Sequence, residues 1–137
     1  TAYNTLPGVK TTSYAEINGK KSTDPVTELL CYRIKAGSVD EATFAALKVG
    51  DNVVLRTKLI NWFGNTPETN NATLLSINGT APAGTITVAA AVEICNGLAP
   101  SNTTTKVESE EVVVAGEVSQ ITEPYTDKYK NITFKLK

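Results

Sequence analysis

The side chains best suited to holding a ligand are aromatic, and they gather in two short stretches. Trp62-Phe63, with the only tryptophan, lies in the Asn-, Gly- and Pro-containing segment Asn61–Pro67, and Tyr125 and Tyr129 flank a second turn. Exposed rings of this kind stack on nucleobases, at about 1–3 kcal/mol per base, and equally on sugar rings. The cations expected to edge the same groove are Arg33, Lys35, Lys128, Lys130 and Lys135.

Residues for catalysis or metal binding are scarce by comparison. The chain has no histidine, which removes the commonest general base and the usual hydrolytic triad. Two cysteines, Cys31 and Cys95, cannot complete a tetrahedral zinc site alone, and they predict either two buried thiols or one disulfide. There is no phosphate-binding loop or dinucleotide fingerprint. We therefore expect a non-enzyme with no cofactor and no metal.

Composition limits the class of protein further. The 137 residues suffice for one domain with a single core, and the net charge of −1 argues against a dedicated phosphate-binding surface. No apolar run approaches the ~20 residues needed to cross a bilayer. The chain lacks methionine, begins at Thr1 and is rich in Thr, Asn and Ala. These features favour a processed, exported protein that is secreted, periplasmic or on the cell surface.

Residue alternation predicts five strands and one weaker one. In Thr27–Lys35, Leu30, Tyr32 and Ile34 share one face, and Leu29, Cys31 and Arg33 share the other. In Tyr129–Lys137 the apolar face is Ile132, Phe134 and Leu136, whereas Gly116 suggests a bulge or bend in Glu111–Ile121. The other predicted strands are Val53–Ile60, Ala72–Asn78 and the weak Thr12–Ile17, which ends at the turn signal Asn18-Gly19 before a polar loop, Lys20–Pro25.

Two short helices complete the predicted elements. Ser38 and Glu41 have the spacing of a capping box, and Phe44 and Leu47 give the helix that follows an apolar side before Gly50 ends it. Thr87 is placed to cap a second helix from Val88 to about Asn96, with Gly97 as its stop. This inventory is typical of a small five-stranded OB-like Greek-key barrel with capping helices. The predicted barrel covers residues 27–137, after an N-terminal arm, 1–26, that carries the weak strand.

Both halves of this barrel resemble parts of one family. Thr87–Leu136 resembles the first half of the OB-fold domains common in secreted and surface proteins of Bacteroidetes, with its leading helix, a V-x-G-x-V strand at Val114–Val118 and a Tyr-Lys-Asn-Ile-Thr-Phe strand at Tyr129–Phe134. Leu29–Gly79 resembles the second half, which includes the Asn61–Glu68 loop. The halves stand in reversed order: residues 27–79 correspond to strands 3–5, and 86–137 to the helix and strands 1–2. Thr57 stands where such domains usually carry glycine.

The resemblance implies a place for a ligand and leaves two functions open. In OB-folds ligands lie across strands 2 and 3 and between the 1–2 and 4–5 loops, which would bring Tyr125 and Tyr129 towards Trp62 and Phe63, beside Arg33 and Lys128. The module would then bind an oligosaccharide or single-stranded nucleic acid, unless Trp62 and Phe63 merely plug a barrel end. The alternative is a structural module that joins other copies or repeats by β-strand exchange, because the reversed order permits either self-closure, a slice through repeats, or exchange.

Overall fold

The computed structural model describes residues 14–17 and 20–137, with side chains from residue 26 onward. Along this part of the chain the elements are β1 (Tyr14–Ile17), β2 (Lys20–Pro25), β3 (Leu29–Lys35), α1 (Glu41–Ala45), β4 (Asn52–Trp62), β5 (Thr66–Ile77), β6 (Ile86–Thr87), α2 (Val88–Asn96), β7 (Pro100–Ser101), β8 (Val112–Glu123) and β9 (Asn131–Leu136).

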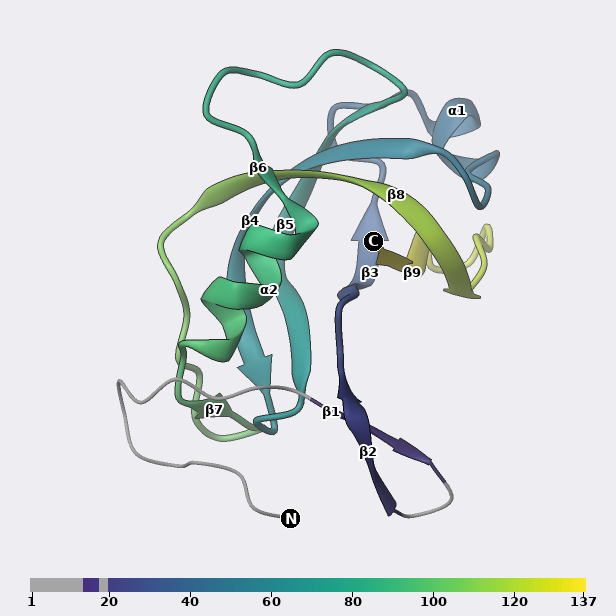
Figure 1. The fold of residues 1–137 in the computed structure, drawn as a ribbon. Coiled ribbons are helices and arrows are strands. Elements are labelled where there is room, and N and C mark those ends of the chain that lie inside the picture. Colours follow the sequence, from purple (N-terminus) through teal and green to yellow (C-terminus); the bar gives the residue numbers. More distant parts are fainter. Residues whose placement is uncertain (1–13, 18–19) are drawn as a thin grey trace.

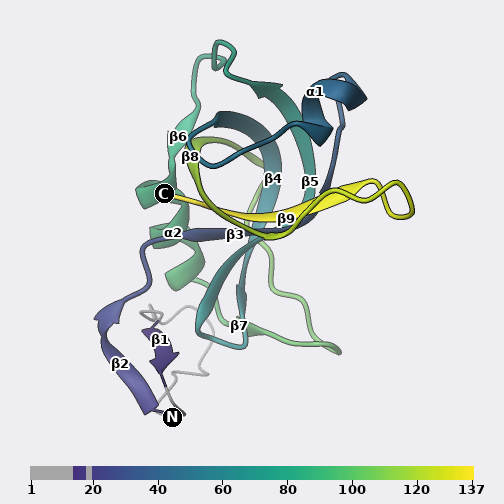
Figure 2. The same ribbon diagram turned by 90° about the vertical axis from the view of Figure 1, so that its right-hand side faces the viewer.

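Five long strands close into a barrel in the order β8-β9-β3-β5-β4, with β4 returning to β8 (Figures 1 and 2). Neighbouring strands are antiparallel except β3 and β5, which are parallel. The expected fold class, a small all-β barrel of OB-like form with two short helices, is confirmed. The C-terminal β8–β9 hairpin closes the barrel of its own chain, pairing with β4 on one side and with β3 on the other. Exchange of this hairpin between copies stays a prediction.

The core fills the barrel with the side chains that alternation places inside. Ile132, Phe134 and Leu136 are all buried, as predicted, and so are Phe44 of α1 and Leu47 just after it. α2 lies against the barrel wall (Figure 1) and contributes Val88, Ala91, Val92 and Cys95. Thr87 caps α2 as predicted, its side chain accepting a hydrogen bond from the Ala90 N–H at 3.1 Å.

Gly116 is required by close packing rather than by a bulge. The pairing of β8 with β4 runs through Gly116 without a register shift. A Cβ built at Gly116 would lie 2.3 Å from Cγ2 of Val88, well inside van der Waals contact. The glycine therefore lets the start of α2 approach β8, and of the two features predicted here, a bulge or a bend, the bulge is absent.

The cap of α1 is Asp40, not Ser38. The Asp40 carboxylate accepts a hydrogen bond from the Thr43 N–H at 2.9 Å, which satisfies one of the free donors of the first turn. The Ser38 N–H instead donates to the Leu74 carbonyl of β5 at 2.9 Å. Tertiary pairing with β5 therefore takes Ser38 away from the predicted capping box.

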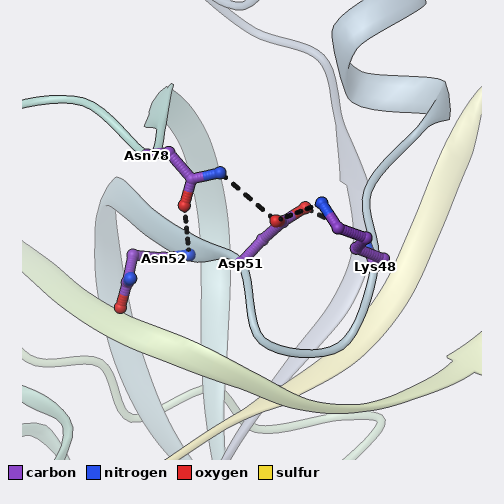
Figure 3. A network of polar contacts seen from close by, with 4 residues as sticks. All are labelled: Lys48, Asp51, Asn52 and Asn78. Carbon is purple, nitrogen blue, oxygen red and sulfur yellow. Dashed lines mark hydrogen bonds and ion pairs between the residues drawn. The ribbon is translucent and has the colours of Figure 1, made fainter.

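A polar network ties the start of β4 to the end of β5 (Figure 3). The Asp51 carboxylate accepts hydrogen bonds from the Lys48 side chain at 2.9 Å, from the Lys48 N–H at 3.0 Å and from Asn78 at 3.2 Å. The Asn78 side-chain oxygen in turn accepts from the Asn52 N–H at 2.8 Å. Burial alone would raise the pKa of Asp51, but these hydrogen bonds outweigh it and lower the pKa.

The N-terminal arm forms a small sheet of its own. β1 and β2 pair antiparallel, so Lys20–Pro25 is a strand and not the expected loop. β1 does not take the sheet position beside β3, whose two neighbours are β9 and β5. Thr12-Ser13 and Asn18-Gly19, which carry part of the predicted strand and its turn, lie outside the described residues.

Candidate ligand-binding site

A bulge in β3 overturns the predicted alternation of that strand. Arg33 has a φ of 51°, in the left-handed region, and the register of β3 against β9 shifts between Cys31 and Ile34. Cys31 and Ile34 are therefore both buried, while Tyr32 and Arg33 both point outward. The bulge is held by Thr133 of β9, whose Oγ1 accepts a hydrogen bond from the Arg33 N–H at 2.9 Å.

A second irregularity lies in β5, the strand next to β3. Asn71 of β5 has a φ of 55°, and the register of β5 against β4 shifts beside it, between Arg56 and Lys58. At this shift the buried Thr57 hydroxyl accepts a hydrogen bond from the Asn70 N–H at 3.2 Å. The Thr57 side chain thus bonds to the displaced part of β5.

Beside the two bulges, β3 and β5 are neighbours with little pairing. Leu30 is paired with Glu68 at one end, and the Ser38 N–H bonds to Leu74 at the other; within the described chain no register pair joins these strands in between. The gap is a hollow of about 660 Å³ in the barrel wall. We call it the β3–β5 hollow. Its lining residues that carry a ring, a charge or an amide are Tyr32, Arg33, Lys35, Trp62, Glu68, Asn70, Asn71 and Lys106.

Trp62 stands at the rim of the β3–β5 hollow. It is the last residue of β4 and is paired with Thr66, so only three residues, 63–65, form the turn. The predicted long loop to Pro67 is wrong because β5 begins at Thr66. The Lys106 Nζ lies 4.5 Å from the Trp62 ring centroid, and Phe63 meets the same ring edge-on at 4.7 Å. Phe63 is 52 % exposed and Trp62 is partly buried, and neither belongs to the core cluster of the described residues.

Glu68 forms part of the floor of the hollow. It is paired with Leu30 and Ile60 on its two sides and is 9 % exposed. Burial raises the pKa of the Glu68 carboxyl to about 7, against the opposing effect of the Lys106 cation. A deeply set carboxyl whose charge changes near neutral pH is typical of a functional position.

Arg33 also borders a second hollow, of about 500 Å³, with Tyr129, Glu123 and Asn131. Tyr129 is 62 % exposed, and the Lys128 Nζ lies 5.2 Å from its ring centroid. The Thr133 hydroxyl, which accepts the hydrogen bond from the Arg33 N–H, itself donates to Glu123 of the second hollow at 2.6 Å. The predicted residues Tyr129 and Lys128 therefore lie at a site that adjoins the β3–β5 hollow through Arg33.

The structure does not bring Tyr125 to Trp62. The Tyr125 ring packs edge-on against Phe44, with centroids 6.0 Å apart, and its hydroxyl donates to Glu41 at 2.7 Å. Both contacts lie with α1, at the opposite end of the barrel from the β4–β5 turn (Figures 1 and 2). The hydrogen bond to Glu41 is the main reason that the pKa of Tyr125 is raised to about 12. The expected cluster of four aromatic rings is wrong in this respect.

Three lining residues are missing from the sequence-based prediction of the site, because tertiary contacts place each of them there. Alternation predicts Tyr32 on the face of Ile34, and the bulge separates them. Lys106 reaches Trp62 from a loop far along the chain, and the sequence around Glu68 predicts a loop, whereas its pairing with Leu30 places it at the floor of the hollow. Of the predicted residues, Trp62, Arg33 and Lys35 come together here.

The remaining chemistry-bearing residues do not form a site among the described residues. Cys31 and Cys95 are free and buried, so the two-thiol interpretation is confirmed, and burial raises the pKa of both thiols. In the part of the chain that is described, no three His, Cys, Asp or Glu side chains gather to hold a metal ion, and no helix is long and apolar enough to span a bilayer.

Comparison with known proteins adds no relative. No family model, no curated protein and no solved structure matches the chain. The resemblance to OB-fold domains of Bacteroidetes therefore stays a prediction, and function has to be argued from the barrel and its hollow.

Proposed function

We propose that this chain is a non-enzymatic binding module that holds a ring of a polymeric ligand, an oligosaccharide or a single-stranded nucleic acid, against Trp62 in the β3–β5 hollow. The observation that carries the proposal is the pair of left-handed residues, Arg33 and Asn71, that line the hollow where β3 and β5 are not paired. Backbone strain of this kind costs about 1–3 kcal/mol per residue and tends to persist at ligand sites. The composition further favours an exported or cell-surface protein.

The lining chemistry supports a polar ligand with flat faces. Trp62 supplies a ring at the rim, and the lining combines apolar side chains such as Leu30 and Ala72 with the donors and acceptors of the charged and amide residues. Polar side chains beside one ring suit ligands rich in hydroxyl or phosphate groups, because each hydrogen bond fixes the ligand's orientation on the ring. The neighbouring hollow at Tyr129 offers a second ring for a longer chain.

The experiment is a titration of the intact protein with two probes, followed by Trp62 fluorescence. One probe set is an array-selected oligosaccharide, and the other is a single-stranded oligonucleotide of about ten nucleotides, within the ~4–16 that an OB-fold holds. We expect one class to bind, Trp62→Ala to abolish binding in calorimetry, and Tyr125→Phe, at the far end of the barrel, to bind like wild type. Salt should weaken only an oligonucleotide response. No response to either class at millimolar concentration would overturn the proposal.

Assembly by strand exchange is the second candidate. The β8–β9 hairpin pairs with β4 over six consecutive positions and with β3 along its other edge. A hairpin held on both edges in this way could close a neighbouring copy's barrel with the same hydrogen bonds. This function predicts an assembly in solution, which the binding module does not require.

A further inference from the structure

Glu68 faces the ligand space and not the barrel core. Register pairs Ile60 with Glu68 and Trp62 with Thr66, and side chains two residues apart on a strand lie on the same face. Glu68 therefore shares the face of Trp62. Within the described residues its carboxylate has no hydrogen-bond partner, although the side chain is only 9 % exposed. A buried carboxylate without donors is costly, and a ligand that brings donors would relieve that cost.

The cations around the hollow, unlike Glu68, are exposed. The Lys106 Nζ lies over Trp62, and the Arg33 guanidinium lies over Tyr32 at 4.9 Å from its centroid. Arg33, Lys35 and Lys106 are all exposed, so water and salt screen their charges. The charge set deepest in the hollow is the carboxylate of Glu68, and screening weakens it least. A phosphate seated on the floor would meet this negative charge, whereas sugar hydroxyls would donate to it.

We propose that the Glu68 carboxylate is the specificity-determining group of the β3–β5 hollow, accepting hydrogen bonds from hydroxyls of a neutral sugar and disfavouring phosphate-bearing chains. This inference rests on the proposed binding function and names its ligand class as a neutral oligosaccharide. Trp62 stacks on the sugar ring, and Asn70, whose Nδ2 donates to Glu108, also lines the hollow.

Ligand affinity at Glu68 should depend on pH. Donors from the ligand favour the ionised carboxylate, so binding lowers a pKa that is about 7 in the free protein. Affinity should therefore rise by up to about tenfold between about pH 6 and about pH 8. The charged groups around Glu68 are Lys106, Arg33 and Lys35, with Glu108 bonded to Asn70 at the wall, and burial raises the pKa of the Cys31 and Cys95 thiols in the core behind it.

The test compares Glu68→Gln with Glu117→Gln, a half-buried glutamate on β8 that forms an ion pair with Lys137. The probes are the tightest neutral oligosaccharide from a glycan array, a uronate-bearing oligosaccharide and oligothymidylate. We expect Glu68→Gln to weaken the neutral sugar by about ten- to a hundredfold and to abolish the pH dependence. The same variant should bind the acidic probes more tightly. Glu117→Gln should behave like wild type, and Glu68→Asp should keep the pH dependence at reduced affinity.

The outcomes separate this inference from the proposed function. If wild type binds none of the probes, both fail. If wild type binds oligothymidylate or the uronate in preference, or if Glu68→Gln binds the neutral sugar unchanged, the binding module stands and the role of Glu68 is overturned. Unfolding curves of each variant, followed by Trp62 fluorescence, show whether a loss of binding reflects a loss of fold.

Discussion

The free-energy cost of the left-handed backbone at Arg33 can be measured by comparing the stabilities of Arg33→Gly and Arg33→Ala. Both variants remove the guanidinium and its contact with Tyr32, so these losses cancel. The difference in stability between the variants then reports the cost of the left-handed backbone conformation. A residue with a Cβ pays about 1–2 kcal/mol in this conformation, and glycine loses about 0.4–1 kcal/mol through the greater entropy of its unfolded chain. We expect the free energy of unfolding to be about 0.5–1 kcal/mol higher for the Gly variant than for the Ala variant.

Urea unfolding followed by Trp62 fluorescence measures this difference, which corresponds to about 2–4 °C in Tm. Lys35 supplies the matched control, because it is exposed on the same strand without a left-handed φ. At Lys35 the order should reverse, with Gly less stable than Ala by about 0.5–1 kcal/mol. If Arg33→Gly is no more stable than Arg33→Ala, the bulge does not hold Arg33 as described. The backbone at the β3–β5 hollow would then not be strained at Arg33.

Three other predictions concern the barrel as a whole. Phe134→Ala should lower the free energy of unfolding by about 3–5 kcal/mol, because Phe134 is fully buried, and a loss below about 1 kcal/mol would make the β8–β9 hairpin peripheral. Asp51→Asn should cost about 2 kcal/mol at neutral pH. Because folding lowers the pKa of Asp51, its contribution is present above the unfolded-state pKa and is lost as pH falls through the folded-state pKa, so urea midpoints of variant and wild type should converge in acid. Light scattering after size exclusion tests strand exchange: an assembly that dissociates into unfolded monomers would support it, and a folded monomer at every concentration would end it.

Several features follow from residues close together in the sequence. The alternation of Ile132, Phe134 and Leu136 determines the buried face of β9, and Thr87 followed by an apolar stripe determines the start and the inward face of α2. These predictions succeed because a strand's two-residue period and a helix cap depend on neighbours within a few positions. The same local signals, added up along the chain, indicate an all-β barrel with two short helices.

The candidate site, in contrast, depends on contacts between distant residues. The Arg33 bulge is held by Thr133, one hundred residues further along the chain, which accepts the Arg33 N–H, and the bulge places Tyr32 and Ile34 on opposite faces. Thr66–Asn71 extends as a strand because β4 pairs with it, although its Pro and Asn residues are typical of a loop. Tyr125 packs on Phe44 rather than near Trp62, and Glu68 reaches the floor of the hollow only when β3 and β5 meet at Leu30. A strand's period places side chains on faces, but only the register between strands decides which faces meet, and register is a property of the closed barrel.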